Sequence, residues 1–370
     1  MEAAGRRPAG PQAAWNRVHR ANRAHGRRMT TDLCIGVIGA GRIGMLHAQN
    51  LARRIPRARV TMVADPRIAC ARAAAATSAA EAVTDHRAVL DRRDIDAVVI
   101  CSSTDTHARI LREAAGCGKH IFCEKPIDHD LDRIRDALQA VSAAGVRLQV
   151  GFNRRFDPDF RALAAAVHSG RFGPPQLVRI TSRDPEPPPL EYIKVSGGLF
   201  MDMSIHDLDM ARYLVQDQVV EVYATGSAYD AAIAAAGDVD TALIVLRFAH
   251  GTLCAIDNSR RAVYGYDQRL EVFGAGGCLG VPNRTSTRVE HWDVSGQHRE
   301  RPLHFFLERY QESYIAEMQE FVDCVRLGRE PEVTGMDGLQ AVLLAHAASI
   351  SCAQSRAVRI DTATARLDAA

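Results

Sequence analysis

Three polar residues are spaced in a way that suits proton transfer. Asp202 and His206 are four residues apart, which on a helix places them on one face, and Asp209 follows one turn later. A histidine beside a carboxylate is oriented and made more basic, as a general base that takes a proton from an alcohol requires. A surface ion pair, or a metal site completed by Asp209, would show the same spacing. The preceding Gly197-Gly198 pair favours a functional site, because glycines let a ligand approach the backbone closely.

A glycine-rich segment predicts a dinucleotide site. Leu33–Ile38 runs directly into Gly39-Ala-Gly41-Arg42-Ile43-Gly44, and Asp65 closes the next strand-like segment 21 residues after Gly44. The first glycine permits a tight turn, the second lets the backbone approach a pyrophosphate, and the third allows close helix packing. Asp65 would accept the ribose hydroxyls and repel a 2′-phosphate, so the motif predicts NAD, with Arg67 leaving NADP open. Arg42 and Ile43 belong to the same cofactor-binding loop.

Two further loops follow strand-like segments. Ser102, Thr104 and His107 come just after one such segment, and Glu124 and Lys125 come after the next. Ligands of doubly wound sheets bind along the carboxyl ends of the strands. We therefore expect these residues to line the cofactor, with Lys125 also reaching the reacting centre. Lys125 would equally suit a solvated surface position, the commoner fate of a lysine in a loop.

Strand-like and helix-like segments alternate over residues 31–152. The helix expected at Leu131–Gly145 repeats apolar residues every three or four positions. Alternation of this kind predicts a Rossmann domain with a doubly wound parallel sheet. Its strands are expected at Leu33–Ile38, Val60–Asp65, Ala82–Thr84, Ile95–Cys101, His120–Cys123 and Arg147–Phe152.

The pattern changes over residues 153–370, where we expect a substrate-binding α+β domain with a large, mainly antiparallel open sheet. Strands rich in β-branched and aromatic residues lie between glycine-containing turns. They are expected at Glu221–Tyr229, Thr241–Phe248, Thr252–Asn258, Gln268–Gly274 and Thr287–Val294. Helices are expected at Asp157–Gly170, Phe200–Leu214, Phe306–Leu327 and Met336–Ser355. An exposed face of the sheet would be a natural association surface.

Composition narrows the class of protein. With 370 residues, 47% hydrophobic and 24% charged, the chain has the make-up of a globular protein of two domains. The net charge is +2, but residues 1–29 hold seven arginines against one glutamate, so they carry +6 and leave −4 on the rest. A mildly acidic body argues against nucleic-acid or anionic-membrane partners. Residues 1–30 are expected to be a disordered extension, with a targeting peptide as the lesser alternative.

The nine cysteines are odd in number and scattered, and they contain no C-x-x-C. Neither a disulfide framework nor a zinc knuckle is expected, so no metal is predicted and a reducing cytoplasm fits best. No apolar run reaches the roughly 18 residues of a membrane span, and the N-terminus lacks a secretory apolar segment. We expect a cytoplasmic protein whose partner is a small molecule.

Together, the glycine fingerprint, Glu124-Lys125-Pro126 and the D-x-x-x-H segment resemble the glucose–fructose oxidoreductase and inositol dehydrogenase family over about residues 33–355. Longer stretches are similar to inositol 2-dehydrogenases in particular: 151–157, 191–198, 257–260, 264–267 and 306–310. The resemblance implies a catalytic set in which His206 accepts the proton, Asp202 orients it, and Lys125 hydrogen-bonds the reacting oxygen. The neighbouring carboxylate would then keep the pKa of His206 near or somewhat above about 6.5.

The resemblance further implies substrate contacts from Arg155, Tyr264 and Tyr266, and it admits a cis Lys125–Pro126 peptide and a homotetramer. The two tyrosines are two residues apart and share a face if extended, so the sequence does not choose between them.

The implied reaction is NAD-dependent oxidation of a ring hydroxyl of a cyclic polyol, with myo-inositol giving an inosose and NADH. A dehydrogenase for scyllo- or chiro-inositol or a pyranose is the alternative, because epimers are distinguished by a few hydrogen bonds. A non-catalytic nucleotide-binding regulator is the other alternative.

Overall fold

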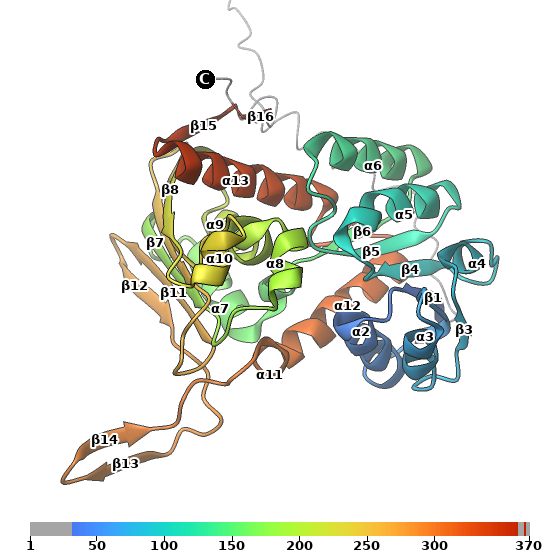
Figure 1. Ribbon diagram of the computed structural model, residues 1–370, viewed down its shortest axis with the longest axis horizontal. Helices are drawn as coiled ribbons and strands as arrows, with labels where there is room; N and C mark the ends of the chain where they lie inside the picture. The colour runs from blue at the N-terminus through green and yellow to red at the C-terminus, as the bar shows by residue number, and fades with distance from the viewer. Residues whose placement is uncertain (1–31, 362–365, 368–370) are drawn as a thin grey trace, which may run out of the picture.

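The computed structural model describes residues 32–361 and 366–367, and these form two large sheets that lie side by side, with a separate two-stranded hairpin (Figure 1). The predicted N-terminal extension lies outside the described residues. Within the described part of the chain, no helix is both long and apolar enough to cross a membrane.

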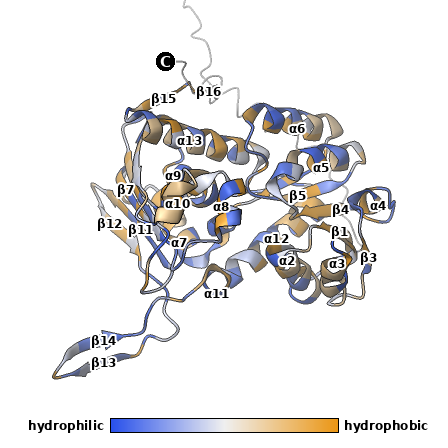
Figure 2. Ribbon diagram, viewed as in Figure 1, coloured by the Kyte–Doolittle hydropathy of each residue, from blue (hydrophilic) through white to orange (hydrophobic). Residues whose placement is uncertain are grey.

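The first sheet is six-stranded and parallel, with the order β3-β2-β1-β4-β5-β6. The order in which the strands are added reverses between β1 and β4, and ligands of doubly wound sheets bind at this point. The predicted Rossmann fold is confirmed, and Figure 2 shows hydrophobic residues in its central strands, as burial on both faces requires. The strands are β1 (Leu33–Ile38), β2 (Ala58–Ala64), β3 (Glu81–Val83), β4 (Ala97–Ile100), β5 (His120–Glu124) and β6 (Leu148–Gly151).

Helices cover both faces of this sheet. The side chains of α4 (His86–Leu90), α5 (Thr104–Gly116) and α6 (Leu131–Ala144) pack on one face. On the other face, α2 (Arg42–Arg53) and α3 (Ile68–Ala75) are joined by α12 (Gln311–Leu327), which comes from far along the chain (Figure 1). Phe321 and Val322 of α12 are fully buried there. The two domains therefore share a core.

The second sheet has eight strands in the order β12-β11-β7-β10-β9-β8-β15-β16. Only β7 and β10 among its pairs are parallel, so the prediction of a mainly antiparallel sheet is confirmed. β7 lies inside the sheet, yet it was not predicted, and neither were β12 and β15. The strands are β7 (Pro175–Arg183), β8 (Val219–Ser227), β9 (Thr241–Phe248), β10 (Leu253–Ser259), β11 (Asp267–Gly274), β12 (Gly277–Val281), β15 (Val358–Asp361) and β16 (Arg366–Leu367).

Helices pack against one face of the second sheet, and α13 runs from beside β8 and β15 toward α6 of the first domain (Figure 1). The helical elements are η1 (Asn153–Phe156), α7 (Pro158–His168), α8 (Leu190–Ser196), the π-helix η2 (Phe200–Ser204), α9 (Ile205–Val215), α10 (Ala231–Ala235), α11 (Phe306–Arg309) and α13 (Gly335–Gln354). The single helix expected at Phe306–Leu327 is interrupted at Tyr310.

The strand expected at Thr287–Val294 does not join the large sheet, so that prediction was wrong. Its centre forms β13 (Glu290–Asp293), which pairs with β14 (Gly296–Arg299) in a separate hairpin that projects from the domain (Figure 1). Every residue of both strands is exposed, so the segment has no buried face to hold it in a sheet.

Candidate active site

The glycine-rich loop has the shape that a dinucleotide requires. Gly39 has a φ of +92°, and a Cβ there would lie 2.4 Å from the Ser102 amide nitrogen. A Cβ on Gly44 would lie 1.9 Å from the Gly39 carbonyl oxygen, so the loop and α2 pack too closely for a side chain. A Cβ on Gly41, at the N-terminus of α2, would meet nothing within 4 Å. The open side of Gly41 therefore leaves room for a pyrophosphate, and the loop fits an NAD-type cofactor.

Asp65 lies directly after β2 and holds this loop in place. Its Oδ2 accepts a hydrogen bond from the Ala40 amide at 2.8 Å, and its Oδ1 accepts one from the Arg67 amide at 2.9 Å. The carboxylate is buried, whereas the Arg67 side chain is 72% exposed. Asp65 thus places a fixed negative charge beside the loop, where a ribose would bind.

Replacing Asp65 with serine should lower the preference for NAD over NADP by at least about tenfold, or ~1.4 kcal/mol. The change removes the charge that repels a 2′-phosphate and leaves the exposed Arg67 guanidinium free to attract it. The ratio of kcat/KM values for the two cofactors measures the effect. Asp65→Asn, which removes the charge but keeps the shape, separates repulsion from lost hydrogen bonding. An unchanged ratio would exclude this role for Asp65.

The other predicted cofactor residues differ in their surroundings. Ser102 shares a hydrogen bond with Thr106 at 2.7 Å, and Thr104 begins α5. Exposed Arg42 lies over the Phe305 ring, with its Cζ 5.6 Å from the centroid, and Ile43 packs partly into the core. These four stay predicted cofactor contacts.

His107 does not suit its predicted contact with the cofactor. Its ring is buried, with Nδ1 2.9 Å from the Pro126 carbonyl oxygen and Nε2 2.9 Å from that of Ser102. Both ring nitrogens are therefore occupied by backbone. His107 joins the loop after β4 to the loop after β5, which is a structural role.

Lys125 and Asp202 come together although 77 positions separate them. The Lys125 Nζ donates a hydrogen bond to the Asp202 carbonyl oxygen at 2.8 Å and lies 3.7 Å from its carboxylate Oδ1. The Lys125–Pro126 peptide is cis. Both side chains are 16% exposed, so Lys125 is not a solvated surface lysine. Its ammonium lies at the carboxyl end of β5, the edge where a cofactor would bind.

The predicted hydrogen bond between Asp202 and His206 is not formed. Asp202 lies in the π-helix η2, and α9 begins only at Ile205, so the i,i+4 spacing of an α-helix does not apply. The Asp202 carboxylate accepts instead from the Tyr192 hydroxyl at 2.9 Å and from Arg260 Nη1 at 3.3 Å. The buried Nδ1 of His206 has no hydrogen-bond partner among the described residues.

The electrostatic surroundings of His206 also differ from expectation. Burial is the main cause that holds the pKa of His206 well below its usual value, and the positive charges of Lys125 and Arg154 add to it. The expected pKa near or above the usual value was therefore wrong, because the neighbouring charges are cations. The imidazole is neutral at physiological pH, which is the form that accepts a proton.

Sequence reasoning missed three side chains around this site. Tyr192 and Arg260 hold the Asp202 carboxylate, and Arg260 is almost fully buried. Burial and the nearby Asp202 charge raise the pKa of Asp184 to about 7. In the sequence, Asp184 stands out only as the first residue of a proline-rich loop. Its closeness to Asp202 is a result of the tertiary structure.

Arg155 does not suit its predicted contact with substrate. It is buried, and its guanidinium donates to Asp209 at 2.5 and 2.8 Å and to Asp337 at 3.0 Å. These bonds tie η1 to α9 and α13. Asp209 is therefore committed to an ion pair, which removes the alternative of a metal site shared with Asp202 and His206.

Tyr264 and Tyr266 do not share a face. Gly265 between them has a φ of +129°, so the segment is not extended. Tyr264 is 41% exposed and donates to Asp267 at 2.6 Å, whereas Tyr266 is buried against Tyr310. The charge of Arg154 acts on both Tyr266 and His206, so the two side chains lie near the same cation.

Gly197 and Gly198 are explained by packing within the protein. Both have a positive φ, of +83° and +80°, where the chain passes from α8 to η2. A Cβ on Gly198 would lie 2.8 Å from Asp238 Oδ1, and that oxygen accepts from the Leu199 amide. The close approach expected from a ligand is therefore made by a side chain of the protein.

Comparison with known proteins agrees with this geometry. Residues 33–152 match the model of an oxidoreductase family with an NAD-binding Rossmann fold, and residues 160–280 match the GFO/IDH/MocA C-terminal domain. A myo-inositol 2-dehydrogenase of Thermotoga maritima is 47% identical over 88% of this chain and 98% of its own. A scyllo-inositol 2-dehydrogenase (NAD+) of Bacillus subtilis is 36% identical over 88% of this chain and 95% of its own.

Solved structures give the same result. A myo-inositol dehydrogenase from Corynebacterium glutamicum has a TM-score of 0.85 at 41% identity, covering 89% of this chain and 99% of its own. A myo-inositol dehydrogenase from Lactobacillus casei, solved with NAD(H) and myo-inositol, has a TM-score of 0.82 at 28% identity, covering 90% of this chain and 98% of its own. The chain therefore belongs to the GFO/IDH/MocA family of oxidoreductases, and its first domain is the NAD-binding Rossmann domain of that family.

Proposed function

We propose that this protein oxidises a ring hydroxyl of a cyclic polyol, converting myo-inositol to 2-keto-myo-inositol as NAD+ is reduced to NADH, in the breakdown of inositol. The observation that carries the proposal is the contact between Lys125 and Asp202 at the carboxyl end of β5, close to a His206 imidazole that burial and the Lys125 charge keep neutral. The inositol dehydrogenases among the relatives support the substrate class.

In this mechanism, His206 takes the hydroxyl proton and Lys125 stabilises the negative charge that develops on the substrate oxygen. Bound NAD+ supplies the hydride acceptor. The Lys125 ammonium gives one of its three hydrogens to the Asp202 carbonyl, which fixes its direction and leaves two for the substrate. Asp202, held by Tyr192 and Arg260, positions Lys125 through this contact.

Tyr266 is the better candidate of the two tyrosines for a substrate contact. It is buried beside the site, whereas the Tyr264 hydroxyl bonds to Asp267 and to Arg183. A ring with several hydroxyls would also suit Asp184, whose carboxyl group can donate when protonated and accept when ionised.

An absorbance assay at the NADH band, with NAD+ or NADP+ and a panel of inositols and aldoses, tests the proposal. We expect the highest kcat/KM with NAD+ and myo-inositol. A higher value with scyllo- or chiro-inositol or with a pyranose would change the substrate but keep the reaction. If none of these polyols gave NADH, a nucleotide-binding regulator would be the better assignment.

We further propose that the protein forms a homotetramer. We also propose that it is cytoplasmic and has no nucleic-acid or membrane partner. The outer face of the second sheet exposes apolar side chains, which on a monomer would face water. They are Tyr223, Leu243, Val245, Leu253 and Phe273, with exposures of 38 to 57%. The free cysteines suit a reducing compartment. Size-exclusion chromatography with light scattering tests the oligomer, and a monomer would contradict it.

A further inference from the structure

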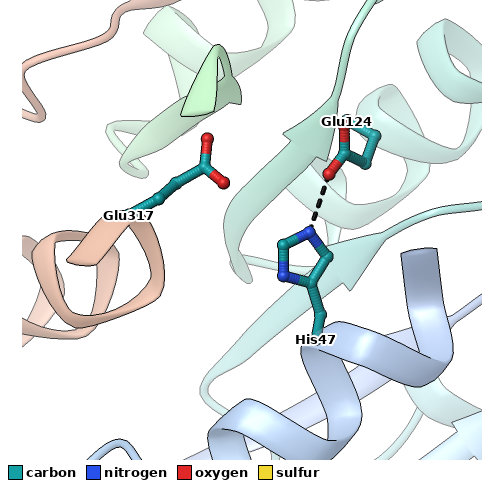
Figure 3. Close-up of side chains that lie close together, drawn as sticks. All are labelled: His47, Glu124 and Glu317. Atoms are coloured by element: carbon teal, nitrogen blue, oxygen red, sulfur yellow. Dashed lines mark hydrogen bonds and ion pairs between the residues drawn. The ribbon is translucent and has the colours of Figure 1, made fainter. Parts of the chain in front are cut away.

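A cluster of three ionisable side chains lies where α2, β5 and α12 meet (Figure 3). His47 comes from α2, Glu124 ends β5, and Glu317 comes from α12, with one ligand atom of each within 4.8 Å of the others. Among the described residues, it is the one group of histidine, cysteine or acidic side chains gathered closely enough to suggest a metal site. Glu124 immediately precedes Lys125, so the cluster adjoins the catalytic machinery.

The carboxylate of Glu124 is closely held. Its Oε1 lies 2.7 Å from His47 Nε2, and its Oε2 accepts from the Lys125 amide at 3.3 Å. A Cβ on Gly151 of β6 would lie 2.9 Å from Oε2, so the carboxylate occupies the space that a side chain there would take. Movement of this carboxylate would therefore move the backbone from which Lys125 extends.

Glu317 is fully buried, and Figure 3 shows its carboxyl group directed toward His47 and Glu124. Neither of its oxygens has a hydrogen-bond partner in the described part of the chain. Two carboxylates beside one imidazole leave at least one excess negative charge in a space closed by Phe122 and Tyr314, whose rings pack against His47. Burying an unpaired ion is strongly unfavourable, so a proton or a cation must offset this charge.

The groups that face Glu317 favour the proton. They are His47 from α2, Glu124 from β5, Cys101 after β4, and Tyr314 from α12. Burial and the Glu124 charge raise the pKa of Glu317 well above its usual range. Burial likewise raises the pKa of the Cys101 thiol and of the Tyr314 phenol, so these stay neutral. The 2.7 Å contact between His47 and Glu124 is already a complete hydrogen bond without a metal.

We propose that Glu317 is held as a protonated, neutral acid beside the His47–Glu124 pair, and that the His47–Glu124–Glu317 cluster positions Lys125 and the cofactor-facing end of β5. The inference extends the proposed function, but it concerns cofactor binding and does not depend on which polyol is oxidised. It gives the cluster a pH response. Glu317 is protonated below its raised pKa and ionises above it, and the two carboxylates then repel each other and displace Glu124.

The test measures NADH affinity by fluorescence titration at a series of pH values from neutral to alkaline. It compares wild type, Glu317→Gln and Glu312→Gln. We expect wild-type affinity to fall by roughly tenfold at alkaline pH and Glu317→Gln, which imitates the neutral acid, to lose this fall. Glu312 lies on the same helix with a 66% exposed side chain, so Glu312→Gln should follow wild type. The same alkaline fall in Glu317→Gln would overturn the proposal. Because no polyol is needed, this result is separate from failure of the proposed reaction.

Two measurements on the wild-type protein keep the proposal testable if Glu317→Gln does not fold. Infrared spectroscopy at neutral pH should show the carbonyl band of a buried, protonated carboxylic acid, and its absence would overturn the proposal. Elemental analysis should find no stoichiometric divalent metal. A metal that is present at one per chain would identify the cluster as a metal site instead, since a histidine and two carboxylates are suitable ligands.

Discussion

Replacing His206 with alanine should lower kcat for polyol oxidation by about 10²–10⁴, the usual contribution of a positioned general base. Wild-type activity should fall on the acid side only at a pH well below the usual histidine pKa. Burial, Lys125 and Arg154 disfavour the imidazolium, so the acceptor is already neutral at physiological pH. As pH falls through this lowered pKa, His206 is protonated and oxidation stops. The pH profile of kcat in the oxidative direction, recorded for both proteins, measures the effect.

His250→Ala is the matched control, because the His250 side chain is 88% exposed. It should keep wild-type turnover and the wild-type profile. Asp202→Asn should leave the midpoint of the limb nearly unchanged, since the Asp202 carboxylate bonds to Tyr192 and Arg260 and not to His206. If His206→Ala kept normal turnover with an unaltered profile, the proton acceptor would be another group.

Lys125→Met should lower kcat by roughly a hundredfold or more, because an oriented donor to a developing negative charge contributes about 2.7–4 kcal/mol in the transition state. Methionine keeps the length and apolar stem of the side chain but removes the cation. The substitution also removes the 2.8 Å hydrogen bond to the Asp202 carbonyl oxygen, so it changes the contacts of the local backbone as well.

NADH affinity, measured separately, distinguishes a catalytic role from a cofactor contact. It should stay close to wild type in Lys125→Met, because we expect the pyrophosphate and the ribose to bind at the Gly39–Gly44 loop and Asp65. A loss of NADH affinity as large as the loss of kcat would assign Lys125 to cofactor binding. Circular dichroism and the thermal midpoint confirm that the variant is folded.

Much of the first domain was predictable because its signals are local. One βαβ unit contains the three glycines, the strand before them and the acid that follows β2. Within such a unit, the spacing along the chain sets the geometry. The same holds for Lys125, because a loop at the carboxyl end of a parallel strand must face the ligand edge.

Errors arose where the geometry depends on contacts that are distant in sequence. The π-helix at Phe200–Ser204 changes which side chains meet, and no spacing rule for an α-helix anticipates it. Arg155 looked available, but only the fold shows that Asp209 and Asp337 occupy its guanidinium. The hairpin strand Glu290–Asp293 has the composition of a strand, yet it lacks a buried face and leaves the sheet.

The sequence by itself determined the Rossmann fold and the NAD-type glycine loop, because each depends on short-range periodicity or motif spacing. It also singled out Lys125, Asp202 and His206 as the expected catalytic set. The tertiary structure alone decided the charge state of His206, the partners of Asp202 and the packing of α12 on the first domain. The physical reason is that burial and electrostatic interaction act through space. Groups such as Lys125 and Asp202, or Glu124 and Glu317, affect each other only after the chain has brought them within a few ångströms.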